Sequence, residues 1–210
     1  MGGFESTKAH VSRTCGNKNM STTRPPATSA ATTPSVPVHA QRLDELFDVV
    51  DENDRVLRQE TRAEVHRQKL LHRSIHVLVF DRACRVFLQK RSLAKDTAPG
   101  CWASSCSGHV DAGEDYDQAV VRELAEEIGI TVTAPPPRWH RAGPCRETGW
   151  EFVWVYRLEH EGPFVLHPAE IDDGRWFTRE ELAAEIAERP RSFALSFLYL
   201  WQRLETELGR

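Results

Sequence analysis

The sequence has few of the features that mark secreted, membrane-spanning or nucleic-acid-binding proteins. Its five cysteines are an odd number without any Cys-x-x-Cys pair, which argues against both a disulfide framework and a zinc ribbon. It has no run of about 18 apolar residues that would span a membrane, and no apolar core of a signal peptide. We therefore expect a cytoplasmic protein without a membrane partner.

Positive charge is also scarce, since the 210 residues carry a formal net charge of −4. Binding to a phosphate backbone depends on clustered Lys and Arg, so we expect no nucleic-acid polymer as a partner. Small phosphorylated ligands remain open. Charged residues at 28% and hydrophobic residues at 40% are typical of a globular domain with a sizeable core, and composition leaves the oligomeric state open.

Residues 1–40 differ in composition from the rest of the chain. They contain twelve Ser or Thr, four Pro and a single acidic residue, so we predict a disordered tail followed by one folded domain over residues 41–210. A basic, Ser-rich leader is also typical of organelle transit peptides, but this one has no clear amphipathic helix. Its first six residues fit the loose N-myristoylation pattern, which applies only in a eukaryotic host.

Hydrophobic patterning predicts strands mixed with helices along the folded domain. Strands are expected at 46–50, 55–57, 75–80, 86–89, 131–133, 139–143 and 150–158. Helices are expected at 62–71, 116–128, 179–188 and 192–208. Thr178 is a predicted N-cap, Gly129 a predicted C-cap, and residues 170–177 a predicted loop. This order suits an α+β fold in which helices cover both faces of a mixed sheet.

The most informative stretch is residues 108–130, where a glycine-punctuated loop leads into a predicted helix. Glu123, Glu126 and Glu127 stand at i, i+3 and i+4, so their carboxylates are expected to share one patch. Two such charges about 5.5 Å apart repel by roughly 3 kcal/mol at an effective dielectric constant of about 20, which favours a bound cation. An all-oxygen site suits Mg²⁺, or alternatively Mn²⁺. For a helix considered alone, a solvated acidic face is the simpler interpretation.

The wider pattern decides in favour of metal. Five residues separate Gly108 from Glu114, and seven more precede the run Arg122 to Ile130, RELAEEIGI. In this spacing the stretch resembles the Nudix hydrolase box at every defined position. The resemblance implies a Nudix-type α/β/α sandwich with a mixed sheet, in which the loop and helix hold divalent metal against a substrate diphosphate.

Outside the box, most of residues 43–200 resemble the isopentenyl-diphosphate isomerase branch of the Nudix superfamily. The matching positions are His72 and its strand, Gln89 to Lys95, Pro99 to Trp102, Gly108 and His109, Glu151 and Trp176. In that branch, histidines and a glutamate of this set hold a metal and a basic loop grips the diphosphate. The resemblance therefore implies Arg91 and Lys95 as substrate-binding residues, with ordinary surface cations as the alternative.

Four histidines leave two interpretations open. His66, His72, His76 and His109 are either separate polar residues or part of a second metal site, because the isomerase set is incomplete in this sequence. His66 stands six rather than seven residues before His72.

Two further departures favour hydrolysis over isomerisation. Ser107 occupies the position of the isomerase's catalytic cysteine, with Cys106 one residue earlier, and Gly149 replaces the first strand glutamate. Isomerising an unactivated alkene requires an acid and a base on opposite sides, and this chain lacks one of them. True isomerases have a degraded box, whereas this box is intact. We interpret Cys106 as a small buried residue, with a reactive thiol as the alternative.

We therefore predict a Mg²⁺-dependent hydrolase that directs water onto a diphosphate linked to another moiety. The predicted metal ligands are Glu123, Glu126 and Glu127. The predicted catalytic residues are Glu126, Glu127, Glu151 and Arg122. The general base is either a box glutamate or Glu151, and Arg122 is expected to orient Glu114 by a charge-assisted hydrogen bond.

Two alternatives remain, an isomerase of the same branch and a non-catalytic sensor that binds a diphosphate. The box does not specify the substrate, which is selected by other loops and strands. Trp150, Phe152, Trp154 and Tyr156 alternate with a period of two, so one face is expected in the core and one of these rings is a candidate to stack on the substrate.

Overall fold

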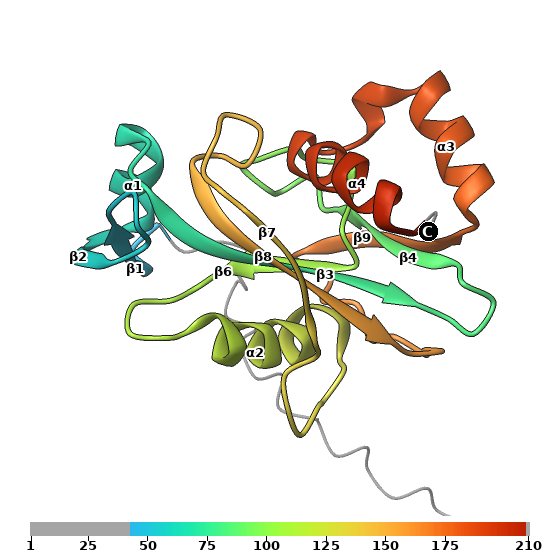
Figure 1. The fold of residues 1–210 in the computed structure, drawn as a ribbon, viewed down its shortest axis with the longest axis horizontal. Helices are drawn as coiled ribbons and strands as arrows, with labels where there is room; N and C mark the ends of the chain where they lie inside the picture. Colours follow the sequence, from blue (N-terminus) through green and yellow to red (C-terminus); the bar gives the residue numbers. More distant parts are fainter. Residues whose placement is uncertain (1–42, 209–210) are drawn as a thin grey trace, which may run out of the picture. The chain divides into compact units, whose positions relative to one another are not determined.

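A mixed sheet lies between two helical layers, as the ribbon in Figure 1 shows. The computed structural model describes residues 43–208, and the predicted tail at 1–40 lies outside the described residues. Helix α2 (Tyr116–Ile128) covers one face of the sheet, and α3 (Arg179–Glu188) and α4 (Leu195–Leu208) cover the other. The predicted α/β/α sandwich is therefore confirmed.

The seven-stranded sheet is built around β3 (His72–Phe80). Its other strands are β4 (Val86–Arg91), β5 (Trp102–Ala103), β6 (Cys106–His109), β7 (Arg138–Ala142), β8 (Glu151–Glu159) and β9 (Ile171–Phe177). Strand β3 pairs in parallel with β8 along its whole length. On its other edge, β6 pairs with the first half of β3 and β4 pairs with its end, both antiparallel. The start of β3 therefore lies between β6 and β8.

Alternation along β3 divides the core into two layers. Ile75, Val77 and Val79 pack in the cluster that contains the buried face of α2. Leu78 and Phe80 pack in the cluster that contains α3 and α4. By the same alternation His72, Ser74 and His76 belong to the row on the α4 side, where the beginning of the strand carries polar side chains.

Local capping explains why α2 begins and ends where the sequence predicts. The Asp115 side chain accepts hydrogen bonds from the backbone N–H groups of Asp117 and Gln118, and the Gln118 side chain accepts one from the Asp115 N–H. Gly129 ends the helix with a φ of 69°, a left-handed conformation that glycine adopts without steric cost. Helix α3 is capped in the same way by Thr178, as predicted.

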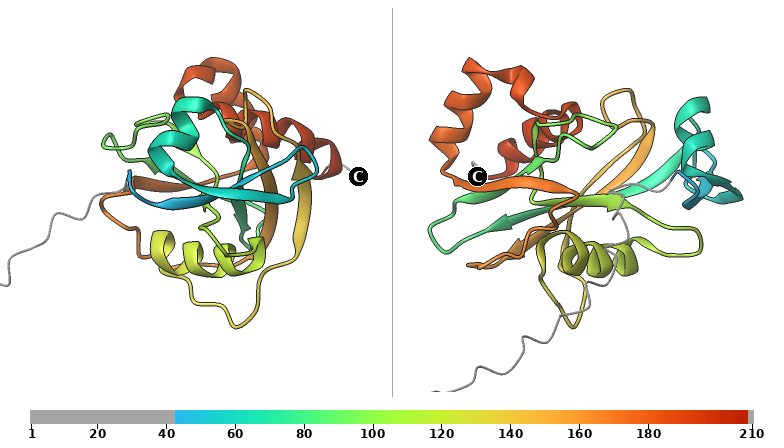
Figure 2. Two further views of the ribbon diagram at one scale, coloured as in Figure 1. Left: turned by 90° about the vertical axis from the view of Figure 1, so that its left-hand side faces the viewer. Right: turned by 180° about the vertical axis from the view of Figure 1, so that it is seen from behind.

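A separate hairpin, β1 (Leu46–Val50) and β2 (Val56–Thr61), leads into the short helix α1 (Arg62–Gln68). Phe47, Val49 and Val65 bury their side chains together and hold α1 against the hairpin. In the ribbon, this unit stands beyond the end of the sheet where β3 begins (Figure 2). Residues of α1 therefore reach the polar start of β3.

Three predicted elements were wrong. Residues 170–177 were expected to form a loop but form β9, which pairs antiparallel with β4. Only Ile171 and Phe177 of this strand are buried, so its polar middle hid the strand pattern. Residues 131–133 form no strand, since Val132 packs on the core without a partner strand. The last helix begins at Leu195 rather than Ser192, because Pro190–Ser192 form a 3₁₀ turn.

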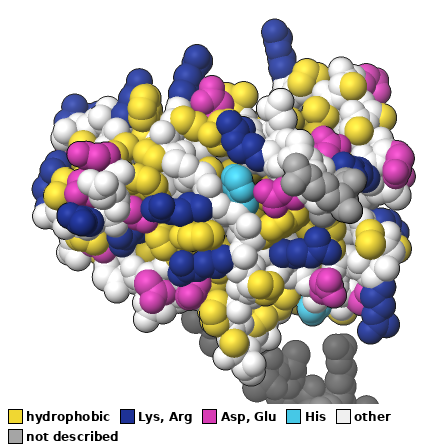
Figure 3. Space-filling view, viewed as in Figure 1, with side chains coloured by type: hydrophobic (Ala, Val, Ile, Leu, Met, Phe, Trp, Pro, Cys, Tyr) yellow, Lys and Arg dark blue, Asp and Glu magenta, His cyan; other side chains and the backbone are white. Residues whose placement is uncertain are grey.

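Charged side chains are dispersed over the face of the molecule seen in Figure 3. Lys and Arg side chains there alternate with acidic and apolar ones instead of forming one continuous stripe. Among the described residues, no helix has both the length and the apolar character needed to cross a bilayer.

The hairpin is tied to the sheet through Asp54, whose side chain is largely buried. Its carboxylate accepts hydrogen bonds from Arg73 Nε at 2.6 Å, Arg141 Nη2 at 2.9 Å and the Tyr116 hydroxyl at 2.9 Å. These donors lie on β3, β7 and α2. One carboxylate therefore connects the turn of the hairpin to three elements of the sandwich.

We expect Asp54→Asn to lower the free energy of unfolding by about 2 kcal/mol, because two guanidinium groups lose a partly buried counter-charge. Asparagine tolerates the left-handed backbone of this position, where φ is 64°, so the effect reports on charge. Urea unfolding of the variant and of Glu52→Gln, an exposed change in the same turn, measures it. Equal stability of the two variants contradicts the prediction.

Candidate active site

A cavity of about 1300 Å³ opens at the end of the sheet where β3 begins. Its walls come from α1, the loop 91–100, the box helix α2, the loop 143–150 and the start of α4. The residues predicted as catalytic, metal-binding or substrate-binding in the hydrolase all line this cavity: Arg91, Lys95, Arg122, Glu123, Glu126, Glu127 and Glu151. The cavity therefore has lining residues from the helices on both faces of the sheet.

Gly108 allows a carboxylate of α2 to reach this cavity. A Cβ atom at position 108 would lie 2.0 Å from Glu123 Oε1, so any other residue there would displace the Glu123 side chain. The absence of a side chain lets Glu123 lie directly against the backbone of β6. The first glycine of the box is thus required by close approach rather than by its φ angle.

Two of the three box glutamates are buried together. Glu127 is 4% exposed, and its Oε2 accepts hydrogen bonds from Ser107 N at 2.9 Å and Gln89 Nε2 at 3.1 Å. Burial and the nearby Glu127 carboxylate raise the pKa of Glu123 to about 8. Glu126 instead lies at the rim with 60% of its side chain exposed. The predicted common patch is therefore a buried pair and one outer carboxylate.

Arg122 holds this arrangement with all five of its N–H donors. It grips Glu114 through Nε to Oε1 at 2.9 Å and Nη2 to Oε2 at 2.8 Å. The remaining donors reach Glu123 Oε1 at 2.8 Å, Glu126 Oε2 at 3.2 Å and the His109 carbonyl at 3.0 Å. These partners raise the pKa of Arg122 despite its burial. No donor is left for substrate, so Arg122 is a positioning residue in this geometry.

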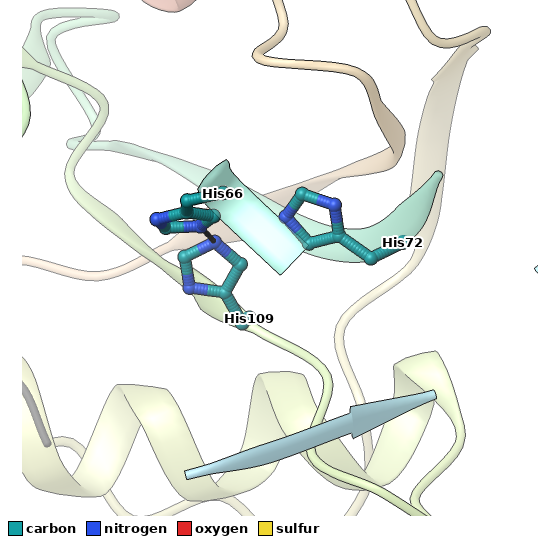
Figure 4. A group of neighbouring side chains, drawn as sticks. All are labelled: His66, His72 and His109. Carbon is teal, nitrogen blue, oxygen red and sulfur yellow. Dashed lines mark hydrogen bonds between the residues drawn. The ribbon is translucent and has the colours of Figure 1, made fainter. Parts of the chain in front are cut away.

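Three histidines from three different elements meet beside the buried pair Glu123 and Glu127 (Figure 4). The candidate ligand atoms of His66 on α1, His72 on β3 and His109 on β6 lie within 4.8 Å of one another. Glu151 Oε1 lies 3.2 Å from His109 Nε2 and 3.5 Å from His72 Nε2. We call these four residues the imidazole cluster. Its three nitrogen donors and one carboxylate form a ligand set suited to a divalent transition metal.

The hydrogen bonds of His72 support this assignment. His72 Nδ1 lies 2.9 Å from the Leu70 carbonyl, which only accepts, so Nδ1 carries the proton and Nε2 presents a lone pair. That Nε2 atom is buried without a hydrogen-bond partner and faces the Glu151 carboxylate. A lone pair directed at a carboxylate is unfavourable unless a proton or a metal cation lies between them. The residues present therefore fit a metal ion.

Arg62 opposes ligation at one position of the imidazole cluster. Its side chain is buried, and Nη1 lies 3.0 Å from His109 Nδ1 while Nη2 pairs with Asp96. Arginine only donates, so Nδ1 of His109 accepts and its proton lies on Nε2, toward Glu151. Ligation through Nε2 of His109 therefore requires the loss of the Arg62 hydrogen bond.

The two predicted substrate cations differ in their availability. Arg91 donates from Nε to the Thr97 carbonyl at 2.9 Å and has no carboxylate partner among the described residues. Lys95 is paired with Glu170, and burial lowers the pKa of Lys95 to about 8. Arg91 therefore offers a charge to an anionic ligand, whereas the charge of Lys95 is already neutralised by its neighbour.

Alternation along β6 separates Cys106 from Ser107. Cys106 is fully buried in the core against α2, and burial raises the pKa of its thiol well above the ordinary value. Ser107 lines the cavity on the other side of the strand. The side chain at the isomerase's cysteine position is thus a hydroxyl, and the neighbouring thiol faces away.

Sequence reasoning missed Arg62, Gln89 and His167, all of which lie in or beside the cavity. Arg62 stands four residues before His66 on α1, a helical spacing that was available as a signal. Gln89 follows an apolar strand, and its bond to Glu127 depends on a contact 38 residues away. No local pattern reveals such a contact.

Comparison with known proteins agrees with this geometry. A family profile described as NUDIX domain matches residues 70–197. An uncharacterised Nudix hydrolase of Yersinia pestis is 32% identical over 171 residues, covering 79% of this chain and 91% of that protein. An isopentenyl-diphosphate Delta-isomerase of Serratia proteamaculans is 30% identical over 165 residues, covering 77% and 92% respectively. The crystal structure of a Deinococcus radiodurans protein is similar with a TM-score of 0.62 at 29% identity, covering 69% of this chain and 90% of that one.

Acidification of the metal-free protein should lower its stability. Burial lowers the pKa of His76 to about 4 and that of His109 to about 3, from an ordinary value of 6.5. The unfolded chain therefore binds protons below pH 6.5 that the folded chain does not. We expect each histidine to contribute a loss of up to about 1.4 kcal/mol per pH unit between pH 6.5 and its folded pKa.

Urea unfolding in chelator at several pH values measures this slope. His76→Gln should remove part of it, because His109 and His66, whose pKa burial also lowers, then remain. A matched change, His160→Gln, alters a histidine outside the cavity and should leave the slope unchanged. Stability that is constant from pH 7 to pH 5 in the unsubstituted protein contradicts the prediction.

Proposed function

The chain belongs to the Nudix family, in the branch that includes isopentenyl-diphosphate isomerases, and we propose that it hydrolyses a diphosphate linked to another moiety with Mg²⁺ or Mn²⁺ as cofactor. The observation that carries this proposal is the pair Glu123 and Glu127 at the wall of the cavity, in which Arg122 holds Glu123 while Ser107 N and Gln89 hold Glu127. Two neighbouring carboxylates, of which only one is paired with a guanidinium group among the described residues, favour binding of a divalent ion. The intact box is therefore the feature of the chain that supports hydrolysis.

Glu123 and Glu127 would hold the ion, because their carboxylates are buried and fixed by hydrogen bonds. When bound, Mg²⁺ or Mn²⁺ neutralises phosphate charge and makes a coordinated water more acidic. Glu126 is the least constrained of the three, with one hydrogen bond from Arg122 and an exposed side chain. We assign it the outer position, from which it completes the metal site or accepts the proton of the attacking water.

Of the two predicted candidates for the general base, a box glutamate and Glu151, we favour the box glutamate and assign Glu151 another role. Burial disfavours its charge, but the neighbouring imidazoles of His109 and His72 outweigh burial and hold the pKa of Glu151 well below the ordinary value. A carboxylate so strongly stabilised is a poor proton acceptor. Glu151 therefore acts as the oxygen ligand of the imidazole cluster, a second metal position next to the box.

Arg91 is the proposed diphosphate contact. Its guanidinium lines the cavity without a carboxylate partner among the described residues, so a phosphate oxygen can accept its free N–H groups. Lys95 contributes indirectly, since its pair with Glu170 fastens the loop 91–100 to the start of β9. The loop is also held there by the bond from Ser92 N to the Glu170 carbonyl.

The imidazole cluster gives the isomerase alternative its best support, because such a cluster is what the isomerase resemblance implies. Against it, Ser107 lines the cavity where the isomerase has its cysteine, and Cys106 is enclosed in the opposite core. A serine hydroxyl does not ionise near neutral pH as a thiol does, so proton transfer to an alkene lacks its acid. Hydrolysis requires neither residue.

Glu127→Gln should lower kcat by at least about 100-fold, as expected for the loss of a metal ligand, while the fold persists. Phosphate release from a panel of nucleoside, sugar and prenyl diphosphates measures this, with and without added Mg²⁺ or Mn²⁺. The control is Glu180→Gln, an exposed glutamate at the start of α3. Full activity of the Glu127 variant on a substrate that the unsubstituted protein cleaves would contradict the assignment of the box as the catalytic centre.

Arg91→Gln should raise KM for the same substrate by about tenfold or more, because a charge-assisted hydrogen bond to phosphate is lost. The matched control is Lys90→Gln, the neighbouring cation of β4, which packs over Trp102 outside the cavity. Steady-state kinetics at saturating metal separates the two variants. An unchanged KM in the Arg91 variant refutes its proposed contact with the diphosphate.

A further inference from the structure

One region of the cavity lies between the loop 143–150 and the start of α4. Arg146 and Trp150 line it from the loop, and Arg191, Leu195 and Leu198 line it from the opposite side. Burial and the nearby Cys145 side chain of the loop raise the pKa of Tyr199 on α4. The ribbon shows this loop and α4 on the same side of the sheet in both views (Figures 1 and 2). We call this region the loop–α4 pocket.

The loop is held in one conformation by a buried threonine. Thr148 is almost fully buried, its Oγ1 accepts from Cys145 N at 3.0 Å, and the same hydroxyl lies within donating distance of the Cys145 and Glu151 carbonyls. Trp150 N also donates to the Cys145 carbonyl at 2.8 Å. The loop therefore presents Trp150 on a fixed backbone.

Trp150 adopts a conformation that large residues rarely adopt. Its φ is 72°, in the left-handed region, and 38% of the side chain is exposed although it is one of the largest apolar side chains. A bulky residue in this region is strained and usually persists only where its surroundings require that conformation. Here the hydrogen bonds of the loop hold the backbone in this conformation, and Trp150 lines the cavity. The ring is therefore available to a ligand.

The cations of the pocket lack partners. Within residues 43–208, neither Arg146 nor Arg191 has an ion pair or a hydrogen bond from its guanidinium group. Arg122, Arg62 and Lys95 differ from them, since each pairs with a carboxylate, whereas Arg91 has no carboxylate partner among the described residues and is the proposed contact of the diphosphate itself. Two unpaired guanidinium groups beside an exposed indole form a surface for a planar group that carries negative charge.

We propose that the loop–α4 pocket binds the moiety attached to the diphosphate, and that this moiety is a nucleoside bearing a further phosphate. This rests on the proposed function. The base stacks on Trp150, with Leu195 and Leu198 providing apolar surface, and the additional phosphate contacts Arg146 and Arg191. A prenyl chain fits this pocket poorly, because it would desolvate two guanidinium groups without replacing their hydrogen bonds to water.

Calorimetric binding of non-hydrolysable fragments tests the pocket separately from catalysis. Three probes are used: adenosine 3′,5′-bisphosphate, adenosine 5′-monophosphate and isopentenyl monophosphate. None contains a diphosphate linkage, so binding does not depend on turnover. The bisphosphate should bind about tenfold more tightly than the monophosphate and the prenyl probe should bind most weakly.

Substitutions then assign the contacts. Trp150→Ala should weaken both adenine probes by about tenfold while Trp150→Phe largely retains binding, because a phenyl ring also stacks. Arg146→Gln and Arg191→Gln should each reduce the preference for the bisphosphate. The matched controls are Trp139→Phe, which packs with Phe80 and Arg157 outside the cavity, and Arg189→Gln, whose partner is Glu188.

Equal binding of the prenyl probe, absence of binding by all three, or unchanged affinity in both Trp150→Ala and Arg191→Gln overturns the proposal. Glu127→Gln, which should abolish hydrolysis, should leave these affinities unchanged in the absence of metal. A variant that loses hydrolysis but still binds the adenine probes therefore has a defect in the box. A variant that loses the preference for adenine probes but still hydrolyses substrate has a defect in the loop–α4 pocket.

Discussion

The geometry of the site depends on Arg122, whose five N–H groups all donate hydrogen bonds to acceptors in the same chain. It fixes Glu114 in the loop before the helix, Glu123 and Glu126 on the helix, and the backbone of His109 on the sheet. A guanidinium group is always charged and planar, so it can hold several carboxylates in one fixed arrangement. Without this cation the carboxylate of Glu123 would lose the guanidinium group that hydrogen-bonds to it. A divalent ion would then bind to carboxylates that are already in position.

Three consecutive residues of strand β6 connect the carboxylates around Arg122 to the imidazole cluster. The Ser107 N–H holds Glu127, the missing side chain of Gly108 admits Glu123, and His109 contributes its ring to the cluster and its carbonyl to Arg122. Any shift of this strand would move both candidate metal positions together. The chain thus combines an intact hydrolytic box with most of the metal set implied by the isomerase resemblance, while its thiol faces the opposite core.

Local features of the fold were predictable, and long-range ones were not. The bounds of α2 followed from apolar spacing and Gly129, and α3 followed from Thr178, because capping and periodicity are local. Strand β9 was missed because its pairing with β4, rather than its polar sequence, makes it a strand. The imidazole cluster depends on sheet register, which aligns His72 with Glu151 and Ser74 with His109. Only the family resemblance, and no spacing, pointed to it.

The most direct test of the account is hydrolysis in ¹⁸O-labelled water, followed by mass spectrometry of the phosphorylated products across a panel of nucleoside, sugar and prenyl diphosphates. The account predicts that at least one substrate yields a product phosphate carrying ¹⁸O, and that chelation of divalent metal abolishes the label. Absence of label from every phosphate, together with deuterium uptake into isopentenyl diphosphate in heavy water, would contradict it.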